Sequence, residues 1–115
     1  MESLHSVGDL DNSALGGVPP AMKAELLLRE RHAMADDAFV ELRIWRVPSS
    51  VRGSRHEYKY ALAYIVRGEC VLRYDNAAGK GDHKHLGAAE MPYRFITPAA
   101  LLADFWRDVA RWRSE

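Results

Sequence analysis

Hydrophobic and polar positions alternate through the middle of the chain, and a period of two predicts β-strands. Residues 39–47 alternate apolar and charged side chains and are rich in β-branched and aromatic types. Residues 58–66 place three tyrosines, a leucine and a valine on one face. Residues 70–74 follow a turn at residues 67–69 and are expected to return as the hairpin partner of residues 58–66. Residues 24–34 have helix-favouring composition, but Asp36 and Asp37 provide a turn before residues 39–47, so we predict a strand that forms a hairpin with them.

The pattern changes to a helical one near the C-terminus. Thr97 is a predicted N-cap, and Pro98 stands at the first helical position, where its missing N–H costs nothing. An apolar stripe at helical spacing follows, formed by Leu102, Phe105, Val109 and Trp112. Because a single sheet cannot bury its apolar side alone, this helix is expected to cover one face. The predicted fold is α+β, an antiparallel β-meander of about four strands with one C-terminal helix packed on one face.

Composition narrows the class of protein. A chain of 115 residues is one domain. We expect residues 1–21, with their Gly-Gly and Pro-Pro pairs, to be a flexible leader and residues 22–115 to be a single domain. The single Cys70 excludes an internal disulfide framework and fits a reducing compartment. With no long apolar run and no signal-peptide pattern, a cytoplasmic protein with no membrane association is predicted.

The net charge of zero conceals an asymmetry along the chain. Residues 1–21 contain Glu2, Asp9 and Asp11 but no lysine or arginine, so the remainder is net positive by three. This mild basicity does not by itself require nucleic acid. Arginines recur through the middle of the chain, however, and a guanidinium is the cation best suited to phosphate.

The segment 74–85 has the highest density of reactive side chains in the chain, with two histidines, two lysines, two aspartates and an asparagine. We expect Asp75 and Asn76 to end a strand and Gly79 and Gly81 to give the following loop its backbone freedom. If the backbone at His83 and His85 is extended, the two side chains point the same way, with Cα atoms about 7 Å apart. The segment is then either an ordinary solvated loop or the reactive centre, and we favour the second.

Two kinds of chemistry fit this pair of histidines. In the first, His83 and His85 act as general acid and base on an RNA phosphodiester, because an ordinary histidine pKa of about 6.5 allows one ring to be neutral and one charged. That route needs no metal ion or cofactor. Asp75 would orient one imidazole and fix its tautomer. In the second, the histidines bind a metal ion with Asp75 or Asp82 as third ligand, although an isolated His-x-His is a weak metal signal.

Several nearby side chains are suited to holding a phosphate or base. Arg55 and His56 precede a strand that a meander would bring towards the histidines. Asn76 would hold the loop or bind the substrate. The predicted substrate-binding residues are Asn76, Lys80, Lys84, Arg73, Arg55 and His56.

These residues together resemble the TumE-type proteins of bacterial toxin–antitoxin pairs. The specific part of the resemblance is Tyr74-Asp75-Asn76 followed by His83-Lys84-His85. It covers about residues 22–113, and residues 1–21 have no counterpart. The other shared segments are 23–26, 39–48, 54–56, 58–64, 79–82 and the Leu102/Phe105-Trp106 helix.

The resemblance implies a small toxin that is neutralised by a helix-turn-helix antitoxin, and toxins of this size and shape are often ribonucleases. The residues lead us to expect a metal-independent ribonuclease. The alternative is a non-catalytic module that binds RNA, a ribosome or a protein through basic and tyrosine side chains. A nucleotidyl-transfer enzyme is disfavoured, because no phosphate-binding Walker loop is present. An exposed edge strand would also allow a homodimer.

Overall fold

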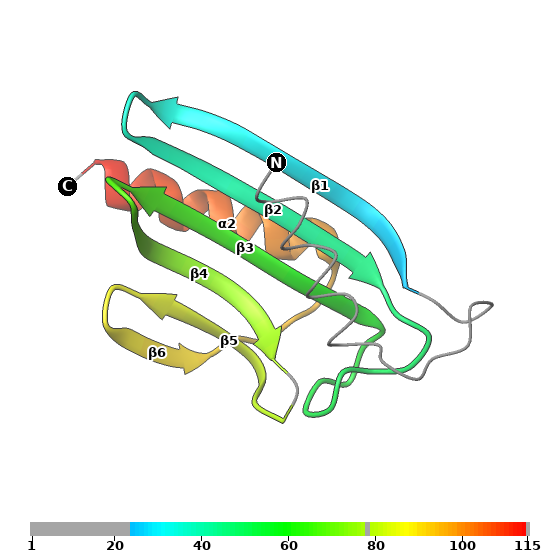
Figure 1. Cartoon of the computed structure of the whole chain (residues 1–115). Coiled ribbons are helices and arrows are strands. Elements are labelled where there is room, and N and C mark those ends of the chain that lie inside the picture. The colour runs from blue at the N-terminus through cyan, green and yellow to red at the C-terminus, as the bar shows by residue number, and fades with distance from the viewer. Residues whose placement is uncertain (1–23, 78, 115) are drawn as a thin grey trace.

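The computed structural model describes residues 24–77 and 79–114, and in them one antiparallel sheet is covered by one helix (Figure 1). The strands follow one another across the sheet in the order of the sequence. The elements are β1 (Glu25–Ala35), β2 (Ala38–Arg46), β3 (Tyr58–Val66), β4 (Glu69–Ala77), β5 (Gly81–Leu86), β6 (Ala89–Pro92) and α2 (Pro98–Arg113). The α+β class and the meander are confirmed. The expectation of about four strands is wrong, because the sheet has six. The expected leader, residues 1–21, lies outside the described residues.

The first four strands arise where the alternation predicted them. β1 pairs with β2 as expected, and Ala35 lies opposite Ala38 across the short turn. β3 pairs with β4 across a turn in which Arg67 and Gly68 both have positive φ, 51° and 78°. The left-handed conformation suits glycine and sets the tight reversal.

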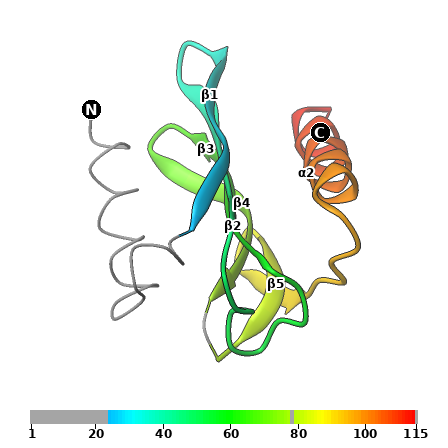
Figure 2. The ribbon, with the colours of Figure 1, turned by 90° about the vertical axis from the view of Figure 1, so that its right-hand side faces the viewer.

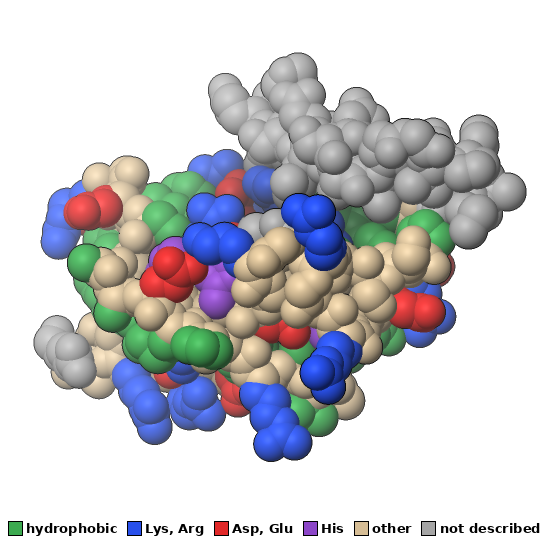
Figure 3. Space-filling view, turned by 90° about the horizontal axis from the view of Figure 1, so that it is seen from below, with side chains coloured by type: hydrophobic (Ala, Val, Ile, Leu, Met, Phe, Trp, Pro, Cys, Tyr) green, Lys and Arg blue, Asp and Glu red, His purple; other side chains and the backbone are tan. Residues whose placement is uncertain are grey.

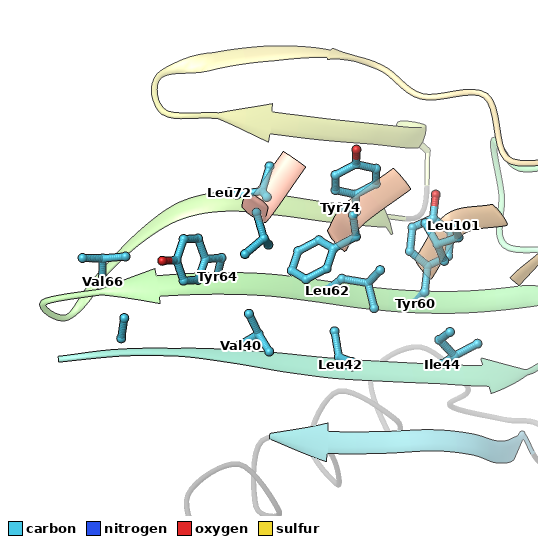
Figure 4. Packing of buried hydrophobic residues seen from close by; sticks show 13 residues of the cluster. Val40, Leu42, Ile44, Tyr60, Leu62, Tyr64, Val66, Leu72, Tyr74 and Leu101 are labelled. Atoms are coloured by element: carbon cyan, nitrogen blue, oxygen red, sulfur yellow. The ribbon is translucent and has the colours of Figure 1, made fainter. Parts of the chain in front are cut away.

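The helix α2 covers one face of the sheet, and the side view shows it as a separate layer (Figure 2). Thr97 is its N-cap, and the Oγ1 of Thr97 accepts a hydrogen bond from the Ala100 N–H at 3.0 Å, as predicted. The buried side of the helix includes Leu101 and Phe105, which pack on apolar side chains from β2, β3 and β4 (Figure 4). This packing holds the helix on the sheet, since burial of apolar surface contributes about 25 cal/mol per Å² to the free energy of folding.

Of the two additional strands, β5 comes from the segment that the sequence suggested was a loop, and β6 follows it. Asp75 and Asn76 lie inside β4, and His83 and His85 lie inside β5. Polar composition concealed β5 and the end of β4, because most of their buried polar groups find a partner only in the folded sheet. Asn76, for example, is fully buried and bonds to the backbone of β3.

A polar network also joins the sheet to α2. Asp108 is only 7 % exposed and accepts hydrogen bonds from the Tyr74 hydroxyl and from Lys84 Nζ, the latter at 3.2 Å. Burial alone would raise the pKa of Asp108, but these two hydrogen bonds and the positive charges of Lys84 and Arg107 outweigh it, so the pKa lies below its ordinary value. The folded protein therefore favours the ionised carboxylate.

This pKa shift predicts a pH dependence of stability. A carboxyl with a lowered pKa stabilises the fold at pH values above its unfolded pKa of about 3.9, and the contribution is lost as the pH falls through the folded-state pKa. We expect the unfolding free energy of the wild type to exceed that of Asp108→Asn at pH 7 and the difference to shrink below about pH 4. Urea unfolding of both proteins from pH 7 to pH 3 measures this difference in unfolding free energy. A difference that is the same at both ends of the range would contradict the ionic role of Asp108.

Among the described residues, no helix combines the length and the apolar character needed to cross a bilayer.

Candidate functional site

Two rows of side chains cross the sheet on the face opposite α2, and they bring together the central residues of the predicted site. The rows follow from strand register, because paired residues on neighbouring antiparallel strands point to the same side. One row contains Arg31, Glu41, Ala63, Arg73, His85 and Glu90, and the other contains Arg29, Arg43, Ala61, Asp75 and His83. We call this surface the open face.

His83 and Asp75 form the buried part of the site. They are 6 % and 9 % exposed, and His83 Nε2 lies 2.8 Å from Asp75 Oδ1. The other ring nitrogen, Nδ1, lies 3.0 Å from the carbonyl oxygen of Gly81. A carbonyl only accepts, so we assign the proton to Nδ1. Nδ1 of His83 is therefore engaged by the backbone, and Nε2 faces the Asp75 carboxylate.

His85 and Glu90 form the accessible part of the site. Their side chains are 33 % and 41 % exposed, and His85 Nε2 lies 3.7 Å from Glu90 Oε2. That distance is too long for a hydrogen bond, so neither group is locked to the other. The rings of His83 and His85 meet edge to face with centroids 5.0 Å apart. The predicted pair of histidines is thus adjacent, with one ring buried and the other open.

Glu90 is the residue that sequence reasoning missed. It is brought opposite His85 by the short hairpin of β5 and β6, whose turn has Gly87 at a φ of 61°. A glycine two residues after His85, followed by a second apolar–polar alternation, is the signal that would have placed it there.

The charges around Glu90 keep it ionised. Lys80 Nζ lies 3.2 Å from Glu90 Oε2, and this hydrogen bond is the main reason that the pKa of Glu90 lies below its ordinary value. The positive charge of Lys80 and of the two histidines lowers that pKa further. Arg73 Nε lies 2.7 Å from Asp75 Oδ2. Lys80 and Arg73, both predicted for phosphate, therefore flank the histidines.

The view from below shows histidine side chains between acidic groups and lysine or arginine side chains (Figure 3). A hollow of about 250 Å³ lies beside Arg73, lined also by Arg43, Glu41, Ala61 and Ala63. The two alanines create it, because their small side chains stand between the longer ones of β2 and β4. The open face thus offers a shallow, cation-lined depression next to the histidines.

Three residues of the predicted site point to the other face. Lys84 forms the ion pair with Asp108 against α2. Asn76 accepts a hydrogen bond from the Tyr60 N–H at 3.0 Å and donates to the Tyr58 carbonyl at 2.8 Å. Asp82, considered as a metal ligand, pairs with Asn76 across the ladder and lies away from His83. The sheet separates these three side chains from the histidines.

His56 and Asp82 form a second polar cluster at that end of the helix-covered face. His56 Nε2 lies 3.0 Å from both carboxylate oxygens of Asp82, and its Nδ1 accepts the Tyr58 N–H at 3.2 Å. The ring stacks on Phe95 with centroids 3.8 Å apart, and Ser54 Oγ donates to Asp82 at 2.9 Å. With both nitrogens and one ring face occupied, His56 fixes the loop before β3.

A cavity of about 630 Å³ opens beside this second cluster. Arg55 and His56, two predicted substrate-binding residues, line it together with Arg94 and Ile96. Lys80 also lines it, so this cavity reaches the edge of the open face at the β4–β5 turn.

A family model described as Toxin TumE matches residues 23–113 of the chain. No curated protein and no solved structure matched the chain. The match covers every described strand and the helix.

Proposed function

Because the chain belongs to the TumE toxin family, we propose that it is the toxin of a toxin–antitoxin pair and a metal-independent ribonuclease that acts on cellular RNA in the cytoplasm. The observation that carries the proposal is the pairing of accessible His85 and Glu90 beside the buried His83–Asp75 pair. Acid–base cleavage of RNA needs one proton acceptor, one proton donor and a cation for the phosphate. The open face offers one group for each task.

The roles follow from protonation and access. The ionised carboxylate of Glu90 accepts the proton of the 2′-hydroxyl, whose oxygen attacks phosphorus. Protonated His85 donates a proton to the 5′-oxygen as the bond from phosphorus to that oxygen breaks. The products are a 2′,3′-cyclic phosphate and a free 5′-hydroxyl, and Lys80 and Arg73 stabilise the charge on the phosphate oxygens. The base role expected of His83 is thus assigned to Glu90, because the His83 side chain is buried and the Glu90 side chain is accessible.

His83 and Asp75 then act as positioning residues. Their rigid, buried pair supports the ring of His85 from one side. We assign no substrate contact to Lys84 or Asn76, because their polar atoms are engaged on the other face. Arg55, which lines the neighbouring cavity together with Lys80, extends the cationic surface for the RNA strand beyond the reacting phosphate.

The first test is RNA cleavage by the tag-free protein in the presence of EDTA. We expect cleavage to persist and to leave 2′,3′-cyclic phosphate and 5′-hydroxyl ends, because no step above uses a metal ion. Mapping of the new ends and a kinase-dependent labelling assay distinguish them from 3′-hydroxyl ends. Cleavage that appears only when a divalent metal ion is added would overturn the metal-independent route.

A second candidate is a non-catalytic module that binds RNA or a ribosome, and the cations of the open face favour it. Binding of that kind depends on many phosphate contacts and weakens steeply with salt. Growth arrest without any cut RNA, weakened gradually as Arg29, Arg31 and Arg43 are replaced, would support this candidate over cleavage.

The toxin family implies a neutralising partner, and we propose a helix-turn-helix antitoxin. The outer strands β1 and β6 each leave one side unpaired within the described sheet, so either edge can add a strand from the antitoxin or from a second copy of the toxin. Co-purification of the chain with the product of a neighbouring gene tests the partner.

A further inference from the structure

The geometry points to a transition-metal site formed by Asp75, His83, His85 and Glu90 on the open face. One ligand atom from each of the first three residues lies within 4.8 Å of the others. Glu90 Oε2 lies 3.5 Å from His83 Nε2 and 3.7 Å from His85 Nε2. One carboxylate oxygen and two imidazole nitrogens therefore lie close enough to share one ion, and the Glu90 carboxylate lies beside both rings.

The tautomer of His83 leaves a lone pair facing that point. Its Nδ1–H is donated to the Gly81 carbonyl at 3.0 Å, so in the neutral ring Nε2 carries no proton. Metal-ligating histidines commonly donate the second ring N–H to a backbone carbonyl, which fixes the tautomer and the ring orientation. The Gly81 contact is an orienting contact of this kind.

Asp75 Oδ1 is a second, independent sign that the site suits a cation. It is buried, and no donor among the described residues makes an aligned hydrogen bond to it. It nevertheless lies 2.8 Å from His83 Nε2. Two lone pairs at that distance repel unless a proton or a metal ion lies between them. Arg73 neutralises the other oxygen, Oδ2, and leaves Oδ1 free for the ion.

The donor set fits a late transition metal such as zinc. Zinc bound tetrahedrally at 2.0–2.1 Å holds its ligand atoms about 3.3 Å apart. Three of the separations, 2.8, 3.5 and 3.7 Å, lie on either side of that value, and the ligand atoms of Asp75, His83 and His85 all lie within 4.8 Å of one another. Imidazole suits zinc and other late transition metals, whereas magnesium prefers oxygen ligands and retained waters.

Metal binding and proton transfer compete for the same atoms. A zinc ion would take the lone pair of His85 and the carboxylate of Glu90, which the proposed cleavage needs for proton donation and acceptance. Zinc is therefore an inhibitor of the proposed ribonuclease, and this consequence, unlike binding itself, rests on the proposed function.

Direct binding to tag-free, metal-stripped full chain tests the site. We expect one equivalent of Zn²⁺ by calorimetry, and with Co²⁺ as probe the visible absorption of a tetrahedral complex. Removal of one ligand by Glu90→Gln or His85→Ala should weaken binding at least about tenfold. Both side chains are partly exposed, so these variants are expected to fold.

The matched control is His32→Ala. His32 also pairs with a glutamate, Glu30, at 2.7 Å, but its ring lies near Trp106 on the helix-covered face. This variant should bind Zn²⁺ as the wild type does. Binding that survives the His83→Ala/His85→Ala double variant, or no binding to the wild type, would overturn the site.

RNA cleavage in the same samples separates the two proposals. Cleavage by metal-free protein that Zn²⁺ inhibits and EDTA restores supports both. Zinc binding without any cleavage supports the site and overturns the ribonuclease. Cleavage without zinc binding supports the ribonuclease and overturns the site. Cleavage that requires zinc supports the site and overturns the metal-independent route.

Discussion

His85→Ala is expected to lower the rate of RNA cleavage by about 100-fold or more, because general acid catalysis typically contributes 10²–10⁴-fold. His85 is the open imidazole of the site, and its proton is the one assigned to the leaving 5′-oxygen. Single-turnover cleavage of a defined RNA by metal-free protein measures the chemical step. Growth of a bacterial host on induction of the variant gives the corresponding cellular result, which should be loss of arrest at equal expression.

The control for this prediction is again His32→Ala, which removes a histidine paired with a glutamate on the other side of the sheet. It should cleave and arrest growth as the wild type does. If His85→Ala cleaves at the wild-type rate, the imidazole of His85 is not the acid. If the His83→Ala/His85→Ala double variant still arrests growth, the histidines are bystanders and the binding-module hypothesis takes precedence.

Asn76→Ala is expected to destabilise the fold by about 3 kcal/mol, since each buried group left without a partner costs about 1–3 kcal/mol. Asn76 is fully buried and bonds to the Tyr60 N–H, the Tyr58 carbonyl and, at 3.3 Å, Ser54 Oγ. It ties β4 to β3 and to the preceding loop. Urea unfolding followed by circular dichroism measures the change.

Arg55→Ala is the comparison for Asn76→Ala. Arg55 is exposed in the same loop, and its removal should change the unfolding free energy by less than about 0.5 kcal/mol. A loss below about 1 kcal/mol for Asn76→Ala would contradict the structural role and favour the earlier expectation that this amide binds substrate.

The sequence predicted most of the fold, because the spacing of the apolar positions indicates which segments form strands and which form the helix. The strands at residues 39–47 and 58–66 and the helix after Thr97 follow directly from period and capping. The strand β5 was not predicted, because the side chains that it points into the protein are polar. They find hydrogen-bond partners only far away in the sequence, as Lys84 does in Asp108. No local pattern reports a partner that lies 24 residues away.

The sequence also predicted part of the site, because the pairing of consecutive strands can be inferred from the pattern. The adjacency of His83, His85 and Asp75 required only the pairing of two consecutive strands, with Asp75 opposite His83. Which face each residue points to depends on the register of β4 and β5, and that register places Lys84 and Asn76 on the helix-covered face. Glu90 needed β6, a four-residue strand too short to give a clear period.

The sequential order of the six strands also determines how the protein folds. Every strand pairs with its neighbour in the chain, so the sheet has low contact order for a β-rich domain, and hairpins of this kind close in about 1–10 μs. Docking of α2 has the highest loop-closure entropy, since the helix must return over strands formed much earlier in the chain. Folding should therefore build the sheet, together with its histidine site, before the core is sealed.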